Sequence, residues 1–287
     1  MSAETLRELI LAARLELESH AVEDAAFNAD CLAAMLLKVK NSQLHGYWQK
    51  PADADFRERF ARLIERRCSH EPLQYIVGEW SFLDFDVLVG PGVLIPRPET
   101  EDVFMAAVQA ISLRPFKDAF RFADVGTGSG ILGIAMTRRF NGAIGAMVDL
   151  SDTALMIARQ NLQRFDEIAP RLSLLRCDLL GAFAPSSLQV VISNPPYIVA
   201  GDIAGLQPEV SQYEPIMALN GGPSGIDLIE KLVRQSEQVL ARGGLLVFEH
   251  GHGQRQQLMQ MINSSWSLIK AGNDLGNRER YMILERS

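Results

Sequence analysis

The residues with the clearest chemical potential are Asn194, Pro195, Pro196 and Tyr197, which directly follow the apolar run 190–193. Neither proline donates a backbone hydrogen bond, and a residue before proline avoids helical geometry, so a strand must end at Asn194. The Asn194 side chain and the Pro195 carbonyl are predicted to accept hydrogen bonds from a planar amino group, while Tyr197 covers its flat face. An ordinary proline-rich turn after a core strand would look the same, so the motif needs support from the rest of the chain.

A glycine-rich stretch gives that support. The predicted strand 120–125 runs directly into Gly126, Thr127, Gly128, Ser129 and Gly130. Glycines let a ligand lie against the backbone at the start of a helix. The spacing G-x-G-x-G differs from the dinucleotide fingerprint, and no Gly-Lys-Ser/Thr follows, so a nucleoside triphosphate is not expected. A tight turn that packs a helix on a strand is the other explanation of this stretch.

Two further predicted strands end close to acidic residues. Asp149 closes the second strand, where a carboxylate can bind both hydroxyls of a ribose. Asp178 and Leu179 follow the third strand and are placed to flank an adenine, with the carboxylate on its amino group and the leucine against its ring. The glycine stretch, Asp149, Asp178 and Asn194 thus follow successive strands, and this order is much more specific than any one motif.

The elements that must position these residues alternate between strand and helix from residue 120 onward, which is typical of a doubly wound, mostly parallel α/β sheet. The carboxyl ends of such strands form one edge of the sheet, where ligands bind. The predicted strands are 120–125, 144–149, 172–175, 189–193 and 244–249, with a final hairpin of 266–270 and 280–284.

The first part of the chain has a different pattern. Residues 5–70 show helical periodicity and predict a small all-helical bundle, in which an arginine-rich segment is either a solvated face or a docking surface for an acidic or RNA-bearing partner. Residues 75–78 and 82–87 are predicted to be short strands of a linking β-hairpin. In the stiff segment 94–101, Arg97 lies between two prolines and is predicted to anchor a carboxylate or a backbone carbonyl of a substrate.

Composition restricts the class of protein. The chain has 287 residues, with 47% hydrophobic residues, 22% charged residues and a net charge of −7, so we expect a globular protein without the basic field that nucleic-acid binding needs. A local basic patch stays possible. The three scattered cysteines predict neither a disulfide framework nor a zinc site, and favour the reducing cytoplasm. The N-terminus has no signal-like apolar segment, so we expect a protein that is neither exported nor bound to a membrane.

The order of the motifs resembles the S-adenosylmethionine-dependent methyltransferases, and Asn-Pro-Pro-Tyr is typical of the branch that methylates planar amino groups. Within that branch, the chain is most similar to the release-factor glutamine N5-methyltransferase family. The resemblance covers nearly the whole chain, and the segments that carry it are 71–78, 94–101, 124–130, 194–198, 213–215, 218–219, 221–222, 249–254 and 274–280.

The resemblance implies a function for each motif. The glycine stretch 126–130 would carry the methionine part of S-adenosylmethionine, Asp149 the ribose, and Asp178 with Leu179 the adenine. The residues 194–197 would hold the target glutamine, which belongs to the Gly-Gly-Gln loop of peptide-chain release factors. The Asn194 and Pro195 acceptors would orient the amide for in-line methyl transfer. We expect a cytoplasmic protein, a monomer, that binds release factors as protein substrate and no nucleic acid.

The resemblance also implies a division into a helical substrate-docking domain (1–72), a linking hairpin (73–95) and a methyltransferase domain (96–287). The chain departs from the family pattern at two positions. Leu179 stands where many members have an aromatic residue, and His250 stands where an aliphatic residue is more usual. His250 and His252 have no third ligand nearby in the sequence, so no metal is expected.

Three other functions stay open from the sequence. A glutamine methyltransferase that acts on a ribosomal protein shares the Asn-Pro-Pro-Tyr motif, but the segment 95–101 favours the release-factor branch. An adenine-N6 methyltransferase uses the same motif on a flipped base and needs a basic surface, which the net charge disfavours. An inactive binding module is disfavoured because all the motifs are intact.

Overall fold

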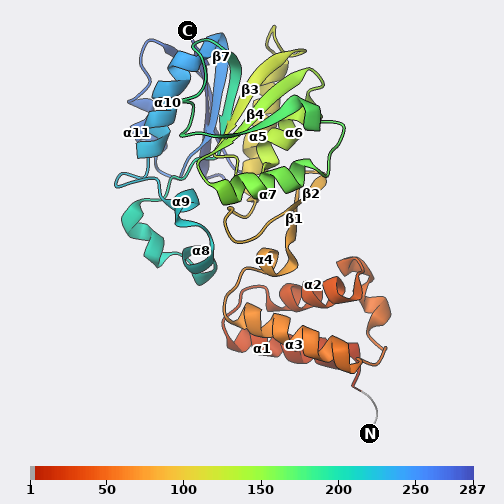
Figure 1. The fold of residues 1–287 in the computed structure, drawn as a ribbon. Coiled ribbons are helices and arrows are strands. Elements are labelled where there is room, and N and C mark those ends of the chain that lie inside the picture. The colour runs from red at the N-terminus through yellow and green to blue at the C-terminus, as the bar shows by residue number, and fades with distance from the viewer. Residues whose placement is uncertain (1–3) are drawn as a thin grey trace. The chain divides into compact units, whose positions relative to one another are not determined.

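The computed structural model describes residues 4–287, and this part of the chain divides into two compact units. One unit comprises residues 4–79 together with 207–213. The other comprises residues 80–206 and 214–287 (Figure 1).

The first unit is helical, as the sequence predicts. Thr5 accepts a hydrogen bond from the Glu8 amide, and the Glu8 carboxylate accepts one from the Thr5 amide, which closes a capping box at the start of the first helix. Leu17, Leu32 and Phe60 form part of its buried core. The elements of this unit are α1 (Leu6–Ser19), α2 (Ala25–Leu37), η1 (Asn41–Tyr47), α3 (Ala54–Cys68), α4 (Leu73–Val77) and α8 (Pro208–Tyr213).

A buried arginine joins the distant segment 207–213 to this unit. The Arg67 side chain donates hydrogen bonds to Asn28 Oδ1 at 2.6 Å and to the Glu71 carbonyl at 3.2 Å, and it forms an ion pair with Glu209 of α8. Burying a guanidinium is costly unless its donors are matched. These three partners match them, and the sequence alone gave no sign that α8 belongs with the helices.

The prediction of a strand at 75–78 was wrong. Residues Leu73–Val77 form helix α4, which begins after Pro72 and ends at Gly78, whose φ of 80° closes the turn. The neighbouring Tyr75 and Ile76 are both buried, whereas a half-buried strand would alternate. The prediction of a single strand at 82–87 was also wrong, because the turn of the hairpin lies at Leu83 and Asp84. The hairpin consists of β1 (Glu79–Phe82) and β2 (Phe85–Leu88).

The second unit is the predicted doubly wound sheet. Its seven strands lie in the order β5-β4-β3-β6-β7-β9-β8, in which β5, β4, β3, β6 and β7 are parallel and the C-terminal hairpin adds antiparallel strands at one edge (Figure 1). The strands are β3 (Phe120–Val125), β4 (Ala143–Asp149), β5 (Leu172–Arg176), β6 (Leu188–Ser193), β7 (Leu240–Glu249), β8 (Trp266–Asn273) and β9 (Glu279–Arg286).

Helices cover both faces of this sheet. Along β6, Val190 and Ile192 belong to one buried cluster and Val191 belongs to the other, because successive side chains of a strand point to opposite faces. The first cluster contains residues of α5 (Pro98–Ser112), α6 (Ile131–Arg139) and α7 (Asp152–Leu162); the second contains residues of α10 (Asp227–Val239) and α11 (Arg255–Met259). The connecting segments contain η2 (Ala169–Arg171), η3 (Ala200–Gly205) and α9 (Ile216–Leu219).

The order of the strands reverses between β3 and β6. From β3 the chain moves outward through β4 and β5 and then returns to β6 on the other side of β3. At such a reversal the connections after two adjacent strands leave in opposite directions, so a crevice opens at their carboxyl ends. The glycine stretch follows β3 and the Asn-Pro-Pro-Tyr motif follows β6, so both motifs lie at this crevice.

The buried Asn161 of α7 supports this region. Its amide donates to the Leu88 carbonyl at 2.9 Å and to the Ser129 carbonyl at 2.8 Å, and it accepts from the Leu88 amide at 2.6 Å. We predict that Asn161→Leu lowers the free energy of unfolding by about 2–4 kcal/mol, because buried backbone groups lose their partners. Urea denaturation measures this change. The control Gln160→Leu, on the exposed side of the same helix, should stay within about 0.5 kcal/mol of the original chain.

Candidate active site

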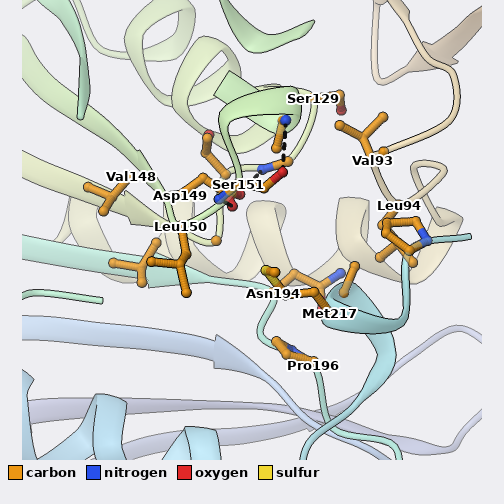
Figure 2. Close-up of a pocket in the computed structure, with 18 of the residues that line it drawn as sticks. Val93, Leu94, Ser129, Val148, Asp149, Leu150, Ser151, Asn194, Pro196 and Met217 are labelled. Atoms are coloured by element: carbon orange, nitrogen blue, oxygen red, sulfur yellow. Dashed lines mark hydrogen bonds between the residues drawn. The ribbon is translucent and has the colours of Figure 1, made fainter. Parts of the chain in front are cut away.

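A cavity of about 600 Å³ lies at the carboxyl ends of β3, β4, β5 and β6 (Figure 2). Of the residues that the sequence singles out, those that line it are Arg97, Gly126, Thr127, Gly128, Ser129, Asp149, Asp178, Leu179, Asn194 and Pro196. Gly130, Pro195 and Tyr197 are not among its lining residues. The cavity therefore brings together motifs from four strand ends.

The glycine stretch forms one wall of the cavity. Gly126 has a φ of 68° and Gly128 a φ of 56°, in the left-handed region that favours glycine. A Cβ atom built on either residue would have its nearest protein neighbour 4.0 Å away. Backbone conformation rather than crowding by the protein therefore requires these glycines, and the space in front of them is open to a ligand.

Gly130 is required by close packing of the protein around it. A Cβ atom at this position would lie 3.3 Å from the Met147 sulfur and 3.4 Å from Ala158 Cβ. Gly130 thus lets α6 pack closely on β4 and α7. For this one glycine, the structure favours the packing explanation of the motif.

The buried Asp124, at the end of β3, anchors the glycine stretch. Its Oδ2 accepts hydrogen bonds from the Thr127 hydroxyl and from the Gly133 amide, the latter at 2.8 Å. Its Oδ1 has no hydrogen-bond partner among residues 4–287. Burial raises the pKa of this carboxyl to about 7. Asp124 belongs to the segment 124–130 that carries the resemblance, but the sequence led to no role for its carboxyl, although an acid before a glycine stretch is itself a signal.

Asp149, at the end of β4, is held by two backbone donors. Its Oδ2 accepts from the Gly128 amide at 3.0 Å and its Oδ1 from the Ser151 amide at 2.9 Å. The carboxylate therefore has a fixed orientation beside the glycine stretch, as Figure 2 shows. It still has lone pairs to offer to a ligand in the cavity.

Asp178 and Leu179 lie beyond the end of β5. Asp178 forms an ion pair with Lys231 at 2.6 Å through its Oδ2, which leaves Oδ1 outside this pair. Leu179 has a φ of 51°, a sparsely populated conformation for a leucine, and it is buried at the wall of the cavity. The Asp178 carboxylate, which accepts hydrogen bonds, and the apolar Leu179 side chain thus lie next to each other at the cavity.

The Asn-Pro-Pro-Tyr motif divides into two parts. The Asn194 amide lines the cavity and donates through Nδ2 to the Thr100 hydroxyl at 3.0 Å, which leaves Oδ1 available as an acceptor. Tyr197 has its hydroxyl bonded to the buried Glu249 at 3.0 Å. Tyr197 therefore belongs to the support of the motif rather than to the cavity wall that the sequence suggested.

Arg97 lines the cavity and is itself held in place. Its guanidinium forms an ion pair with the buried Glu214, whose other oxygen accepts from the Ile95 amide at 3.4 Å. Glu214 lies in the segment 213–215, which carries the resemblance, but nothing in the sequence predicts its contact with Arg97. Glu214, which is far from Arg97 in the sequence, thus holds the Arg97 guanidinium in place at the cavity.

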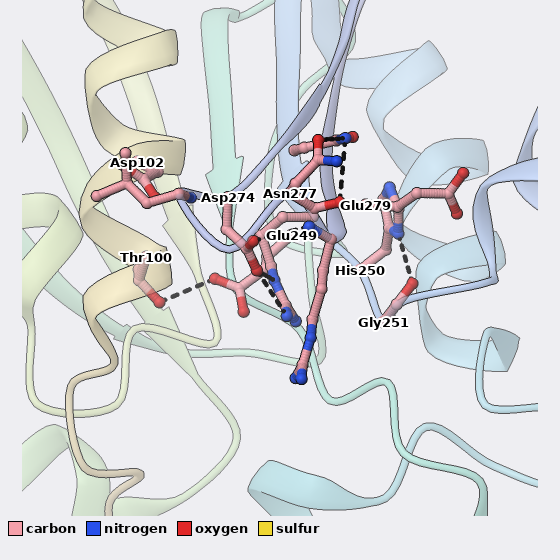
Figure 3. A network of polar contacts seen from close by, with 12 residues as sticks. Thr100, Asp102, Glu249, His250, Gly251, Asp274, Asn277 and Glu279 are labelled. Carbon is pink, nitrogen blue, oxygen red and sulfur yellow. Dashed lines mark hydrogen bonds and ion pairs between the residues drawn. The ribbon is translucent and has the colours of Figure 1, made fainter.

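His250 directly follows β7 and makes a local contact. His250 is fully buried, its Nδ1 lies 2.8 Å from the Gly251 carbonyl (Figure 3), and burial lowers its pKa. Among residues 4–287, no group of three or more His, Cys, Asp or Glu side chains is arranged to hold a metal ion. Within the same part of the chain, no helix has the length and apolar character needed to cross a membrane.

Known proteins match both parts of this chain. The family model "PrmC N-terminal domain" matches residues 8–78, and "Methyltransferase small domain" matches residues 107–206. The release factor glutamine methyltransferase of Koribacter versatilis is 32% identical over 97% of this chain and 98% of its own length. The enzyme of the same name from Nitratidesulfovibrio vulgaris is 31% identical over 99% of this chain and 96% of its own length.

The chain belongs to the release factor glutamine methyltransferase family. It is a methyltransferase whose methyl donor is S-adenosylmethionine. Solved structures agree on the fold: a ribosomal protein L11 methylase from Lactobacillus delbrueckii has a TM-score of 0.50 at 20% identity, covering 69% of this chain and 84% of its own. A methyltransferase from Pyrococcus furiosus has a TM-score of 0.51 at 15% identity, covering 71% of this chain and 90% of its own.

The cavity fits the cofactor of this family. The open glycine wall accepts a flexible amino-acid chain, the fixed Asp149 carboxylate suits a pair of hydroxyls, and Asp178 with Leu179 suits a planar ring that carries an amino group. The volume of about 600 Å³ is in the range of cavities that hold molecules of this size.

We predict that Asp149→Asn raises the dissociation constant for S-adenosylmethionine roughly 10- to 100-fold, because a charged acceptor is lost and the Gly128 amide loses its carboxylate. Isothermal titration calorimetry measures the constant. Asp152→Asn is the matched control, since the exposed Asp152 pairs with Arg176 and does not line the cavity. Unchanged affinity in the Asp149 variant would contradict a role of this carboxylate in the cavity.

We also predict a pH dependence of stability from Asp124. Since burial raises the pKa of this carboxyl to about 7, the folded state binds its proton more tightly than the unfolded state does. Its contribution to stability is therefore present below about pH 4 and is lost as the pH rises through about 7. In urea denaturation at several pH values, Asp124→Asn should gain stability relative to the original chain as the pH rises. A constant difference would contradict the raised pKa.

Proposed function

We propose that this chain transfers the methyl group of S-adenosylmethionine to the side-chain amide nitrogen, N5, of the glutamine in the Gly-Gly-Gln loop of peptide-chain release factors, and so supports translation termination. The observation that carries the proposal is the position of the Asn194 amide, which lines the same cavity as the glycine stretch and Asp149. Full-length relatives named release factor glutamine methyltransferase support the choice of substrate.

The cofactor would lie along the strand ends. The glycine stretch 126–130 would hold its methionine part, Asp149 its ribose hydroxyls, and Asp178 with Leu179 its adenine. S-adenosylmethionine supplies an electrophilic methyl group when bound. The remaining part of the cavity, between Asn194 and Arg97, is then left for the substrate.

Asn194 would position the target amide. An amide nitrogen is a poor nucleophile because its lone pair is delocalised into the carbonyl group. The Asn194 Oδ1, which lines the cavity, would accept one of its hydrogens. The Pro195 carbonyl, which does not line the cavity in this structure, would accept the other once the substrate is bound, and the lone pair would then be held toward the methyl donor. Both acceptors also stabilise the positive character that the nitrogen gains during transfer. Asn194 does not titrate, so its contribution is orientation and electrostatics.

The rest of the motif would keep this arrangement rigid. Pro196 lines the cavity and Pro195 is buried, and the two together limit the backbone on either side of the acceptor carbonyl. Tyr197 ties the motif to Glu249 beneath the cavity. Arg97, fixed by Glu214, would hold a backbone carbonyl of the substrate loop.

The exposed Ile216 and Met217 of α9 line the cavity and would cover the substrate loop from the solvent. The substrate would be a protein rather than a nucleic acid, since the net charge of −7 opposes binding of a phosphate backbone. We place the protein in the cytoplasm, where release factors act, and propose that it acts as a monomer.

A methyl-transfer assay tests this function. With labelled S-adenosylmethionine, a purified release factor should take up label, and the same factor with the glutamine of its Gly-Gly-Gln loop changed to alanine should not. If a ribosomal protein or DNA takes up the label instead, the proposed substrate is wrong.

The same assay tests Asn194. We predict that Asn194→Ala lowers kcat by roughly 10²- to 10³-fold while the dissociation constant for S-adenosylmethionine changes little, since the lost group orients the substrate amide. The exposed Asn263 lies outside the cavity and provides the control Asn263→Ala. Near-normal turnover of the Asn194 variant would refute the role of its amide.

A further inference from the structure

A series of hydrogen bonds connects the Asn194 side chain to the buried side chains of Thr100 and Glu249. Asn194 Nδ2 lies 3.0 Å from the Thr100 hydroxyl. The Thr100 hydroxyl lies 2.8 Å from Glu249 Oε2, and Figure 3 shows this contact between Thr100 and Glu249. The Tyr197 hydroxyl donates to the other oxygen of Glu249 at 3.0 Å. Thr100 and Glu249 are both buried, and they come from α5 and from the end of β7.

The number of hydrogens available for these hydrogen bonds determines the orientation of the Asn194 amide. An ionised carboxylate only accepts, and a threonine hydroxyl has a single hydrogen. Once Thr100 donates that hydrogen to Glu249, it offers only lone pairs to Asn194. The Asn194 amide must then turn its NH2 group toward Thr100, and its oxygen is left for the cavity. Without this constraint the two ends of the amide are nearly equal in shape.

We propose that Thr100 and Glu249 are positioning residues that fix the orientation of the Asn194 amide, so that Oδ1 rather than Nδ2 meets the substrate amide. This inference rests on the proposed function of Asn194. With the opposite orientation, Asn194 would present N–H groups to the N–H groups of the glutamine, and the substrate would lose an acceptor.

The burial of Glu249 supports this assignment. Placing a carboxylate at 1% exposure costs free energy that a neutral residue would not cost. The charged and titratable groups around it come from several elements, namely Glu99 of α5, Tyr197, the adjacent His250, and Arg280 of β9 with its partner Asp274. Arg280 is bonded to Asp274 and Tyr197, so it offsets the charge without taking the carboxylate oxygens away from Thr100 and Tyr197.

Protonation of Glu249 would remove the constraint on the orientation of the Asn194 amide. Burial raises its pKa to about 7. A protonated Glu249 is able to donate to Thr100, and the Thr100 hydrogen is then free to face Asn194 Oδ1. Because the carboxyl is ionised only above its pKa, the correct orientation should be lost as the pH falls through about 7.

Variants of Thr100 test the proposal. Thr100→Val keeps the shape and removes the hydroxyl, whereas Thr100→Ser keeps the hydroxyl. We expect Thr100→Val to lower kcat roughly 10- to 100-fold, with the dissociation constant for S-adenosylmethionine within about twofold, and Thr100→Ser to restore most of the activity. Thr137→Val is the matched control, since Thr137 is equally buried and donates only to the Gly133 carbonyl at 2.9 Å. Equal kcat values for the Val and Ser variants of Thr100 would overturn the proposal.

The pH profile separates orientation from a merely structural role. The kcat of the original chain should fall on acidification through about pH 7, while Glu249→Gln, which cannot titrate, should give a low kcat without this step. Asp124 has a raised pKa as well, so the step is assigned to Glu249 only if Glu249→Gln removes it. A step that persists in this variant would contradict the role of Glu249.

A measurement without substrate keeps the inference separate from the proposed function. In 15N-labelled protein, the side-chain NH2 signal of Asn194 is identified by its loss in Asn194→Asp. We expect its hydrogens to exchange at least about tenfold more slowly in the original chain and in Thr100→Ser than in Thr100→Val. If release factors take up no label but this difference is found, the proposed function fails and the orientation stands. Equal exchange in all three proteins would overturn the orientation.

Discussion

The register of three strands determines where the chemistry takes place. Ser193 of β6 pairs with Val125 on one side and with Phe248 on the other. The next residue, Asn194, therefore lies between Gly126 and Glu249, and Pro195 and Pro196 prevent the strand from continuing past this row. One backbone constraint thus puts the glycines that we propose to face the cofactor, the amide that we propose to face the substrate and a buried carboxylate next to each other.

Two buried carboxyls stand behind this row, and each has its pKa raised to about 7 by burial. Asp124 holds the glycine stretch through Thr127 and the Gly133 amide. Glu249 holds Thr100 and Tyr197, and through Thr100 it reaches Asn194. Burying these two acids lowers the stability of the protein, but their hydrogen bonds fix the orientation of groups at the cavity. Buried acids with shifted pKa values are typical of functional sites.

Sequence reasoning succeeded where the signal is local. The strand ends at Asp149 and Asn194 follow from apolar runs that stop at a loop or at proline, and the alternation of strand and helix predicts the sheet. It failed at residues 75–78, where β-branched and aromatic residues favour a strand but Pro72 and Gly78 enclose the helix Leu73–Val77. It also missed pairs such as Arg67 with Glu209 and Thr100 with Glu249, because only the folded chain brings such distant residues together.

The most direct test of this account is a crystal structure of the protein with S-adenosylhomocysteine and a peptide that contains Gly-Gly-Gln. The account predicts that the glutamine side-chain nitrogen lies within hydrogen-bond distance of Asn194 Oδ1, with Asn194 Nδ2 still bonded to Thr100. A glutamine side chain bound away from Asn194, or held by its Nδ2, would contradict the account.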